Sequence, residues 1–122
     1  MTTILVIEDE EVIRLNILEL LEAEGFTALS AENGRAGVRL AHERQPDLIL
    51  CDVTMPELEG YGVLAAVRAD LTTATLPFVF LTARAEPADE QRGLTLGANA
   101  YLTKPFTRRQ LLDTLAAHLP KR

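Results

Sequence analysis

The sequence predicts an α/β fold of the doubly wound class, in which a parallel sheet carries helices on both faces. Short apolar runs of strand length alternate with stretches of helical periodicity along all 122 residues. Three runs are almost wholly apolar, as in strands covered on both faces, at residues 3–7, 47–51 and 77–81. Two more polar runs, at 26–30 and 100–103, are predicted as edge strands. Strands that alternate with helices imply right-handed crossovers and therefore a mostly parallel sheet.

Helical periodicity fills the segments between and after these runs. The first helix is predicted at about 10–24 and ends before Gly25, a residue type that commonly follows a helix. The last helix repeats apolar residues on one face and ends before Pro120. Three weaker helices are predicted at about 34–44, 60–69 and 87–96.

Composition and charge limit the function classes. A chain of 122 residues with 48% hydrophobic residues suits one domain, which we expect over residues 1–122 without an output domain. The net charge of −6, without a run of Lys or Arg, disfavours direct binding to nucleic acid or to an anionic membrane. Neither a membrane-spanning segment nor a signal peptide is evident. The single Cys51 cannot form an internal disulfide, so we expect a buried thiol and a cytoplasmic protein.

Polar side chains gather where the predicted strands end. The first strand is followed by Glu8 and Asp9, the third by Asp52, the fourth by Thr82 and the fifth by Lys104. In open α/β sheets the functional crevice lies beyond the carboxyl ends of the strands, where the strand order reverses. In the flavodoxin-like order 2-1-3-4-5 the first and third strands are neighbours, so the three carboxylates would lie close together.

Each of these residues also has an ordinary structural explanation. The acidic run 8–11 could cap the first helix, since carboxylates in the first turn complement the helix dipole. Asp52 could accept loop amides, Thr82 could begin a turn, and Lys104 could be solvated before a proline. Their coincidence at one edge of one sheet favours a functional site.

Three carboxylates in a small crevice repel one another, and this repulsion needs an offset. Either some of them hold protons with raised pKa values, or a cation neutralises them. Hard oxygen ligands in small number suit Mg²⁺, which uses one or two carboxylates plus a phosphate oxygen. Asp52 is then a nucleophile that forms an aspartyl phosphate, while Thr82 and Lys104 bind phosphoryl oxygens.

This pattern resembles the receiver domain of two-component response regulators. The resemblance spans essentially the whole chain and rests on four segments, ILVIEDEE, LILCDVTMPELEGYGVL, VFLTARAE and GANAYLTKPF. It implies that Asp52 is phosphorylated and that Asp9 binds Mg²⁺ directly. It also implies that Glu8 assists through water and that the main-chain carbonyl of Thr54 is a further metal ligand.

The same resemblance implies a conformational switch. Thr82 and Tyr101 match the pair that changes conformation in the family, and the Lys104–Pro105 peptide bond would be cis. Thr54 and Arg84, two residues beyond Asp52 and Thr82, are expected to flank the phosphoryl group and to tune its lifetime.

The predicted function is therefore reversible storage of a phosphoryl group in a phosphorelay. The expected phosphodonor is a sensor histidine kinase or a histidine phosphotransfer protein, and the signal would pass to a separate output protein. Phosphorylation would change the surface of the fourth helix, fifth strand and fifth helix. Self-phosphorylation and slow autodephosphorylation would make the chain mainly a switch and only a weak enzyme.

Three rival functions remain open at this stage. A degenerate receiver would act only as a docking module. An aspartate-based phosphatase of the haloacid dehalogenase kind needs a DxD motif after the first strand, where this chain has Asp9 and Glu11. A flavin-binding module needs hydroxyl and glycine residues that bind phosphate there, and neither GxGxxG nor GxxxxGK[ST] occurs.

Overall fold

The structure is a computed structural model that describes residues 1–83 and 86–120. Strands and helices alternate strictly along the described chain. Their bounds are β1 (Thr3–Ile7), α1 (Glu11–Ala23), β2 (Thr27–Ala31), α2 (Gly34–Arg44), β3 (Leu48–Asp52), α3 (Gly60–Ala69), β4 (Phe78–Thr82), α4 (Pro87–Thr95), β5 (Ala100–Thr103) and α5 (Arg108–His118). None of the described helices has the length and apolar character needed to cross a bilayer.

The sheet confirms the predicted topology. All neighbouring strands pair in parallel, in the order β2-β1-β3-β4-β5. β2, β3 and β4 each begin one residue later than their apolar runs suggested. Asp47 directly precedes β3, and its carboxylate accepts a hydrogen bond of 2.7 Å from the Thr3 N–H at the start of β1. Asp47 thus contacts the neighbouring strand through its side chain. The later bounds make Asp52 the last residue of β3, where it pairs with Leu81.

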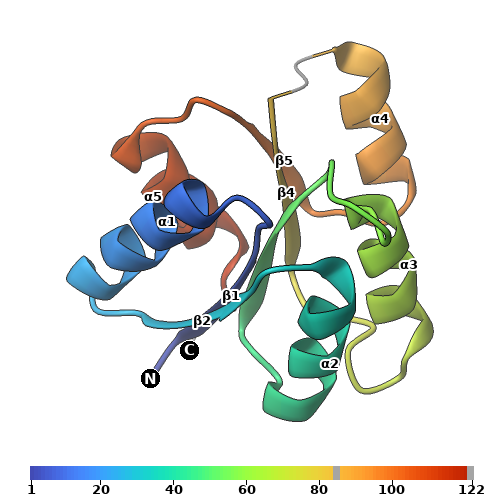
Figure 1. Ribbon diagram of the computed structural model, residues 1–122, viewed down its shortest axis with the longest axis horizontal. Helices are drawn as coiled ribbons and strands as arrows, with labels where there is room; N and C mark the ends of the chain where they lie inside the picture. Colours follow the sequence, from blue (N-terminus) through green and yellow to red (C-terminus); the bar gives the residue numbers. More distant parts are fainter. Residues whose placement is uncertain (84–85, 121–122) are drawn as a thin grey trace.

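Helices cover both faces of the sheet (Figure 1). α1 and α5 lie on one face, and α2, α3 and α4 lie on the other. Successive residues of β1 alternate between these layers, with Ile4 and Val6 in one apolar cluster and Leu5 and Ile7 in the other. Complete burial of such side chains contributes about 1.5–3 kcal/mol each. β1, β3 and β4, which lead to or end in the acidic residues and Thr82, are thus embedded in the core, whereas the edge strand β5 is only partly buried.

Gly60 brings the loop after β3 back against the end of that strand. Its N–H donates a hydrogen bond of 2.8 Å to the Val53 carbonyl. A Cβ atom at this position would lie 2.3 Å from the Asp52 carbonyl oxygen, which is far inside van der Waals contact. Glycine therefore permits the close approach that holds the Asp52 backbone in place.

Glu57 lies in the same loop with a backbone φ of 65°, in the left-handed region. A residue with a Cβ atom pays roughly 1–2 kcal/mol for this conformation, whereas glycine adopts it freely. The loop after Asp52 is therefore strained at this position.

Replacing Glu57 by glycine should stabilise the fold. We expect Glu57→Gly to raise the free energy of unfolding by about 0.5–1 kcal/mol, because relief of the strain exceeds the entropy lost by glycine. Urea unfolding measures this change. The matched control is Glu59→Gly, which removes the same charge at a φ of −68°. Equal effects of the two variants would contradict the strain at Glu57.

Candidate functional site

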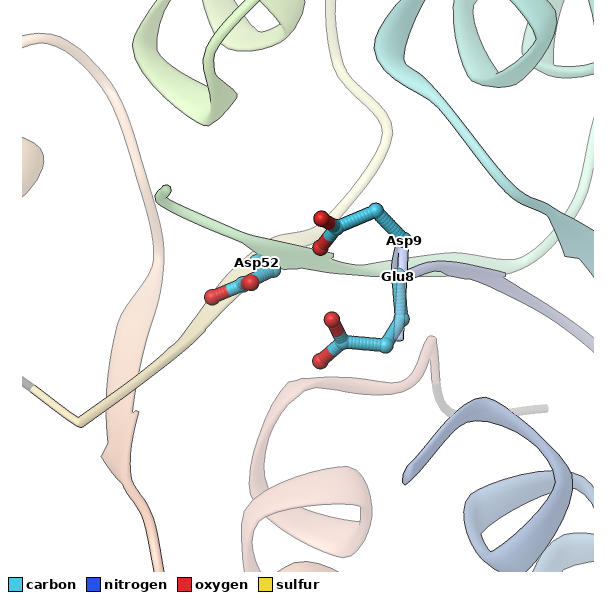
Figure 2. Close-up of side chains that lie close together, drawn as sticks. All are labelled: Glu8, Asp9 and Asp52. Atoms are coloured by element: carbon cyan, nitrogen blue, oxygen red, sulfur yellow. The ribbon is translucent and has the colours of Figure 1, made fainter. Parts of the chain in front are cut away.

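The structure brings three predicted carboxylates together at the carboxyl ends of β1 and β3 (Figure 2). Glu8 and Asp9 directly follow β1, and Asp52 ends β3. One carboxylate oxygen from each residue lies within 4.8 Å of the others. Since β1 and β3 are adjacent parallel strands, their ends place these side chains at one point of the sheet. The sequence-based placement is confirmed.

Burial makes this cluster costly. The Glu8 residue is fully buried, Asp52 is 6% exposed, and Thr82 at the end of β4 is 1% exposed. Carboxylates removed from water favour their neutral form unless they are paired or hydrogen-bonded. The Asp52 carboxylate gains one such bond, of 2.9 Å, from the Val53 N–H.

Lys104 supplies a cation to the cluster. Its ammonium forms an ion pair with the Glu8 carboxylate, and its Nζ lies 3.6 Å from Asp52 Oδ1. The backbone holds the lysine in place, because the Lys104 N–H donates to the Thr82 carbonyl at 2.7 Å. The Lys104–Pro105 bond is cis, as the resemblance implied. Sequence reasoning considered protons or a metal as the offset and missed this ion pair.

The remaining charge imbalance appears in the acid–base properties of the cluster. The pKa of Asp52 is raised from 3.8 to about 7, first by burial and then by the charge of Glu8, while Lys104 acts in the opposite direction. The pKa of Asp9 is also raised, chiefly by burial and then by Glu8. One ammonium does not neutralise three carboxylates, so a hard divalent cation with a preference for oxygen ligands fits this donor set.

A cavity of about 770 Å³ opens over these residues. Its polar lining includes Asp9, Asp52, Thr54, Thr82 and Lys104, with Glu10 and Asn16 farther along α1 and its N-terminus. Its apolar wall comes from α1 and the segment before α5, and comprises Ile13, Ile17, Leu20, Pro105 and Phe106. A ligand in the cavity can therefore reach the Asp52 carboxylate, the Thr82 side chain and the Lys104 ammonium at once.

Of the other predicted site residues, one lines this cavity, one lies in β5 outside its lining, and one falls beyond the described chain. Tyr101 is half-buried, and its ring packs against Phe80 with centroids 5.7 Å apart. Burial raises the pKa of the Tyr101 phenol, and Tyr61 raises it further. Thr54 lines the cavity, but its role as a carbonyl ligand stays a prediction. Arg84 lies outside the described residues.

One residue near the cluster was missed by sequence reasoning. Arg14, in the first turns of α1, donates from Nη1 to the Glu8 carbonyl at 2.9 Å and to the Asp9 carbonyl at 3.5 Å. The only signal in the sequence is its position one helical turn after Glu10, which places it near the start of the helix. The Glu10 side chain makes no capping hydrogen bond, whereas Glu11 lies in the first turn, where a carboxylate complements the helix dipole.

The raised pKa of Asp52 predicts a pH-dependent stability of the metal-free protein. In the folded state Asp52 keeps its proton up to about pH 7, whereas in the unfolded chain it loses the proton near pH 4. The protonated Asp52 therefore stabilises the fold fully below the unfolded pKa. This stabilisation is lost as pH rises through the folded pKa. Between these limits, the free energy of unfolding should fall by an amount on the order of 1–3 kcal/mol.

Asp52→Asn should abolish this part of the pH dependence, because asparagine does not ionise. Urea unfolding with a chelator at about pH 5 and about pH 8 measures it. Asp113→Asn, at an exposed site on α5, is the control and should keep the wild-type trend. A wild-type trend in Asp52→Asn would show that Asp52 ionises normally.

Comparison with known proteins agrees with this geometry. The family profile of the response regulator receiver domain matches residues 4–116. The phosphate regulon transcriptional regulatory protein PhoB of Pseudomonas aeruginosa is 38% identical over 117 residues, which are 96% of this chain and 51% of PhoB. This chain thus spans about half the length of that relative. Protein PilH of the same species is 35% identical, over 98% of both chains.

A solved structure is also closely similar. It is the receiver domain of a sensor histidine kinase from Pseudomonas aeruginosa PAO1, with a magnesium ion coordinated in its active site cleft. The two structures share a TM-score of 0.89 and 33% identity, over 96% of each chain. The sheet order, the acidic cluster at its switch point and these similarities lead to one conclusion: the chain belongs to the response regulator receiver domain family.

Proposed function

We propose that this chain is a phosphoacceptor switch of a two-component signalling system, in which Asp52 takes a phosphoryl group from a phosphohistidine. The surroundings of Asp52 support this proposal most strongly. Asp52 is a buried carboxylate at a cavity that Thr82 and Lys104 also line. Phosphoryl transfer depends mainly on positioning and charge stabilisation, and these groups supply both.

The acidic cluster is the proposed site of Mg²⁺. Asp9 and Asp52 would be direct carboxylate ligands, the Thr54 carbonyl a third ligand, and Glu8 an acceptor for bound water. This assignment is supported by the excess of carboxylates over ammonium groups and by the magnesium ion in the related kinase receiver domain. When bound, the ion neutralises negative charge, which favours the ionised Asp52 and the incoming phosphoryl oxygens.

In the proposed transfer, a carboxylate oxygen of Asp52 attacks phosphorus while the bond from phosphorus to the histidine nitrogen breaks. The electron pair of that bond stays on the imidazole, which leaves as a neutral ring with the proton on its other nitrogen. Lys104 exchanges its contact with Glu8 for a phosphoryl oxygen, and the Thr82 hydroxyl donates to another. Attack by water on phosphorus later releases inorganic phosphate and restores the carboxylate.

The phosphoryl group would act as a switch through Thr82 and Tyr101. Thr82 ends β4, the strand before α4 in the chain, and Tyr101 lies in β5 against Phe80. Movement of the Thr82 hydroxyl toward the phosphoryl group would favour an inward Tyr101 ring and change the surface of α4, β5 and α5. The gain in partner binding is limited by how differently the partner binds the two states.

The proposed partners follow from this chemistry. A sensor histidine kinase or a histidine phosphotransfer protein would supply the phosphoryl group, and a separate output protein would bind the switched surface. We place the reaction in the cytoplasm, in line with the buried and unpaired Cys51. The net charge of −6 disfavours nucleic acid as a direct partner.

The rival phosphatase assignment gains no support from the geometry. It would need a second acid two residues after its nucleophile, which would be Glu11 after Asp9. Glu11 is exposed in the first turn of α1 and lies outside the carboxylate cluster.

The proposed function predicts one phosphoryl adduct on Asp52. Incubation with a small acyl phosphate and Mg²⁺ should add the mass of one phosphoryl group to the wild-type chain, as measured by intact-mass spectrometry. The adduct should be absent from Asp52→Asn, retained in Asp113→Asn, and strongly reduced when a chelator removes the metal. If the wild type forms no adduct with either an acyl phosphate or a phosphorylated histidine kinase, the proposal is wrong.

Thr54 and Arg84 are predicted to tune the phosphoryl lifetime. Thr54→Ala and Arg84→Ala should each change the rate of autodephosphorylation several-fold, because both residues are proposed to restrict the approach of water. Loss of the adduct over time, followed by intact mass, measures this rate. Both variants should still form the adduct, and a variant that cannot be phosphorylated would contradict the tuning role.

A further inference from the structure

Arg14 contacts the backbone of Glu8 and Asp9, the two acidic residues that follow β1. Its Nη1 donates to the Glu8 carbonyl at 2.9 Å and is within 3.5 Å of the Asp9 carbonyl. Its own N–H begins the hydrogen bonding of α1 by donating to the Glu10 carbonyl at 2.9 Å. The side chain and the backbone of Arg14 therefore attach three consecutive carbonyls to the start of the helix.

The peptide unit between Asp9 and Glu10 connects Arg14 to the cluster. A trans peptide is planar, and its C=O and N–H point in opposite directions. Its carbonyl side contacts Arg14, and its Glu10 N–H donates to Glu8 Oε2 at 3.3 Å. A charged donor polarises the peptide unit that it contacts, so the Arg14 contact with the Asp9 carbonyl would strengthen the bond received by the Glu8 carboxylate. The shorter bond of 2.9 Å to the Glu8 carbonyl is the main attachment of Arg14.

The Glu8 carboxylate is consequently held on both oxygens. Oε2 accepts from the Glu10 N–H, and Oε1 accepts from the Lys104 ammonium. Among the residues that the structure describes, no carboxylate lies within 4.0 Å of the Arg14 guanidinium. The guanidinium is thus committed to backbone oxygens and not to a surface ion pair.

We infer that Arg14 is a positioning residue, which orients the backbone of Glu8 and Asp9 so that their carboxylates face Asp52 as a preformed metal site. This inference rests on the proposed function for the identity of the metal, and it assigns a role to a residue that touches neither the metal nor the phosphoryl group. Mutation of outer groups that orient metal ligands commonly lowers metal affinity by about 10- to 100-fold, and we expect an effect of this order for Arg14.

Loss of charge and loss of positioning at Arg14 change the Mg²⁺ affinity in opposite directions. Removal of a positive charge near a cation site should, by charge alone, strengthen Mg²⁺ binding. Loss of positioning should weaken it. Weaker binding in a variant that lacks the guanidinium therefore cannot be explained by the lost charge.

The experiment measures Mg²⁺ affinity by calorimetric titration of the metal-free, full chain. Arg14→Met keeps the apolar stem, Arg14→Lys keeps the charge, and Arg44→Met is the control for lost charge at an exposed position in the last turn of α2. We expect Arg14→Met to raise Kd about tenfold. Arg14→Lys should recover part of this loss, and Arg44→Met should match the wild type.

A second measurement is independent of the metal and of phosphorylation. The amide proton resonance of Glu10 in the metal-free protein should move upfield in Arg14→Met, since its hydrogen bond to Glu8 weakens. An unchanged Kd and an unmoved Glu10 resonance in a folded Arg14→Met variant would overturn the inference. If the wild type binds Mg²⁺ but forms no phosphoryl adduct, the proposed function fails while the role of Arg14 stands.

Discussion

Crowding of three carboxylates at the ends of two adjacent strands is the constraint on which the rest of this site depends. Glu8, Asp9 and Asp52 are forced together by the parallel pairing of β1 with β3, and burial removes most of the water around Glu8 and Asp52. Such an arrangement persists only if other groups offset the repulsion. Lys104 provides part of this offset, yet the pKa of Asp52 stays raised, first by burial and then by the charge of Glu8.

The surrounding fold keeps the constraint in place. Apolar clusters on both faces of the sheet hold the strand ends, and Gly60 presses the following loop against the Asp52 backbone. A carboxylate that cannot move away from its neighbours is well suited to bind a cation, since the cation relieves the excess of negative charge. In the proposed switch, the same rigidity would let a small change at Thr82 reach β5 and Tyr101.

Much of the fold and the placement of the site could be predicted from the sequence, because both follow from periodicity. Two-sided apolar runs mark buried parallel strands, and topology then brings Asp52 beside Glu8 and Asp9. The Glu8–Lys104 ion pair joins residues 96 positions apart, and the reach of the lysine side chain has no signature in the sequence. The left-handed Glu57 and the backbone contacts of Arg14 also escaped, because they depend on loop geometry that residue patterns do not encode.

The ionisation of Asp52 itself tests this account most directly. A ¹³C NMR titration that follows the side-chain carboxyl carbon of Asp52 can be made in the metal-free protein and again with saturating Mg²⁺. We expect a pKa of about 7 without the ion and a clearly lower value with it, because the cation replaces the proton as the offset to Glu8. A pKa near the ordinary 3.8 in the metal-free protein would contradict the account, since it would mean that neither burial nor the neighbouring Glu8 disfavours the ionised Asp52.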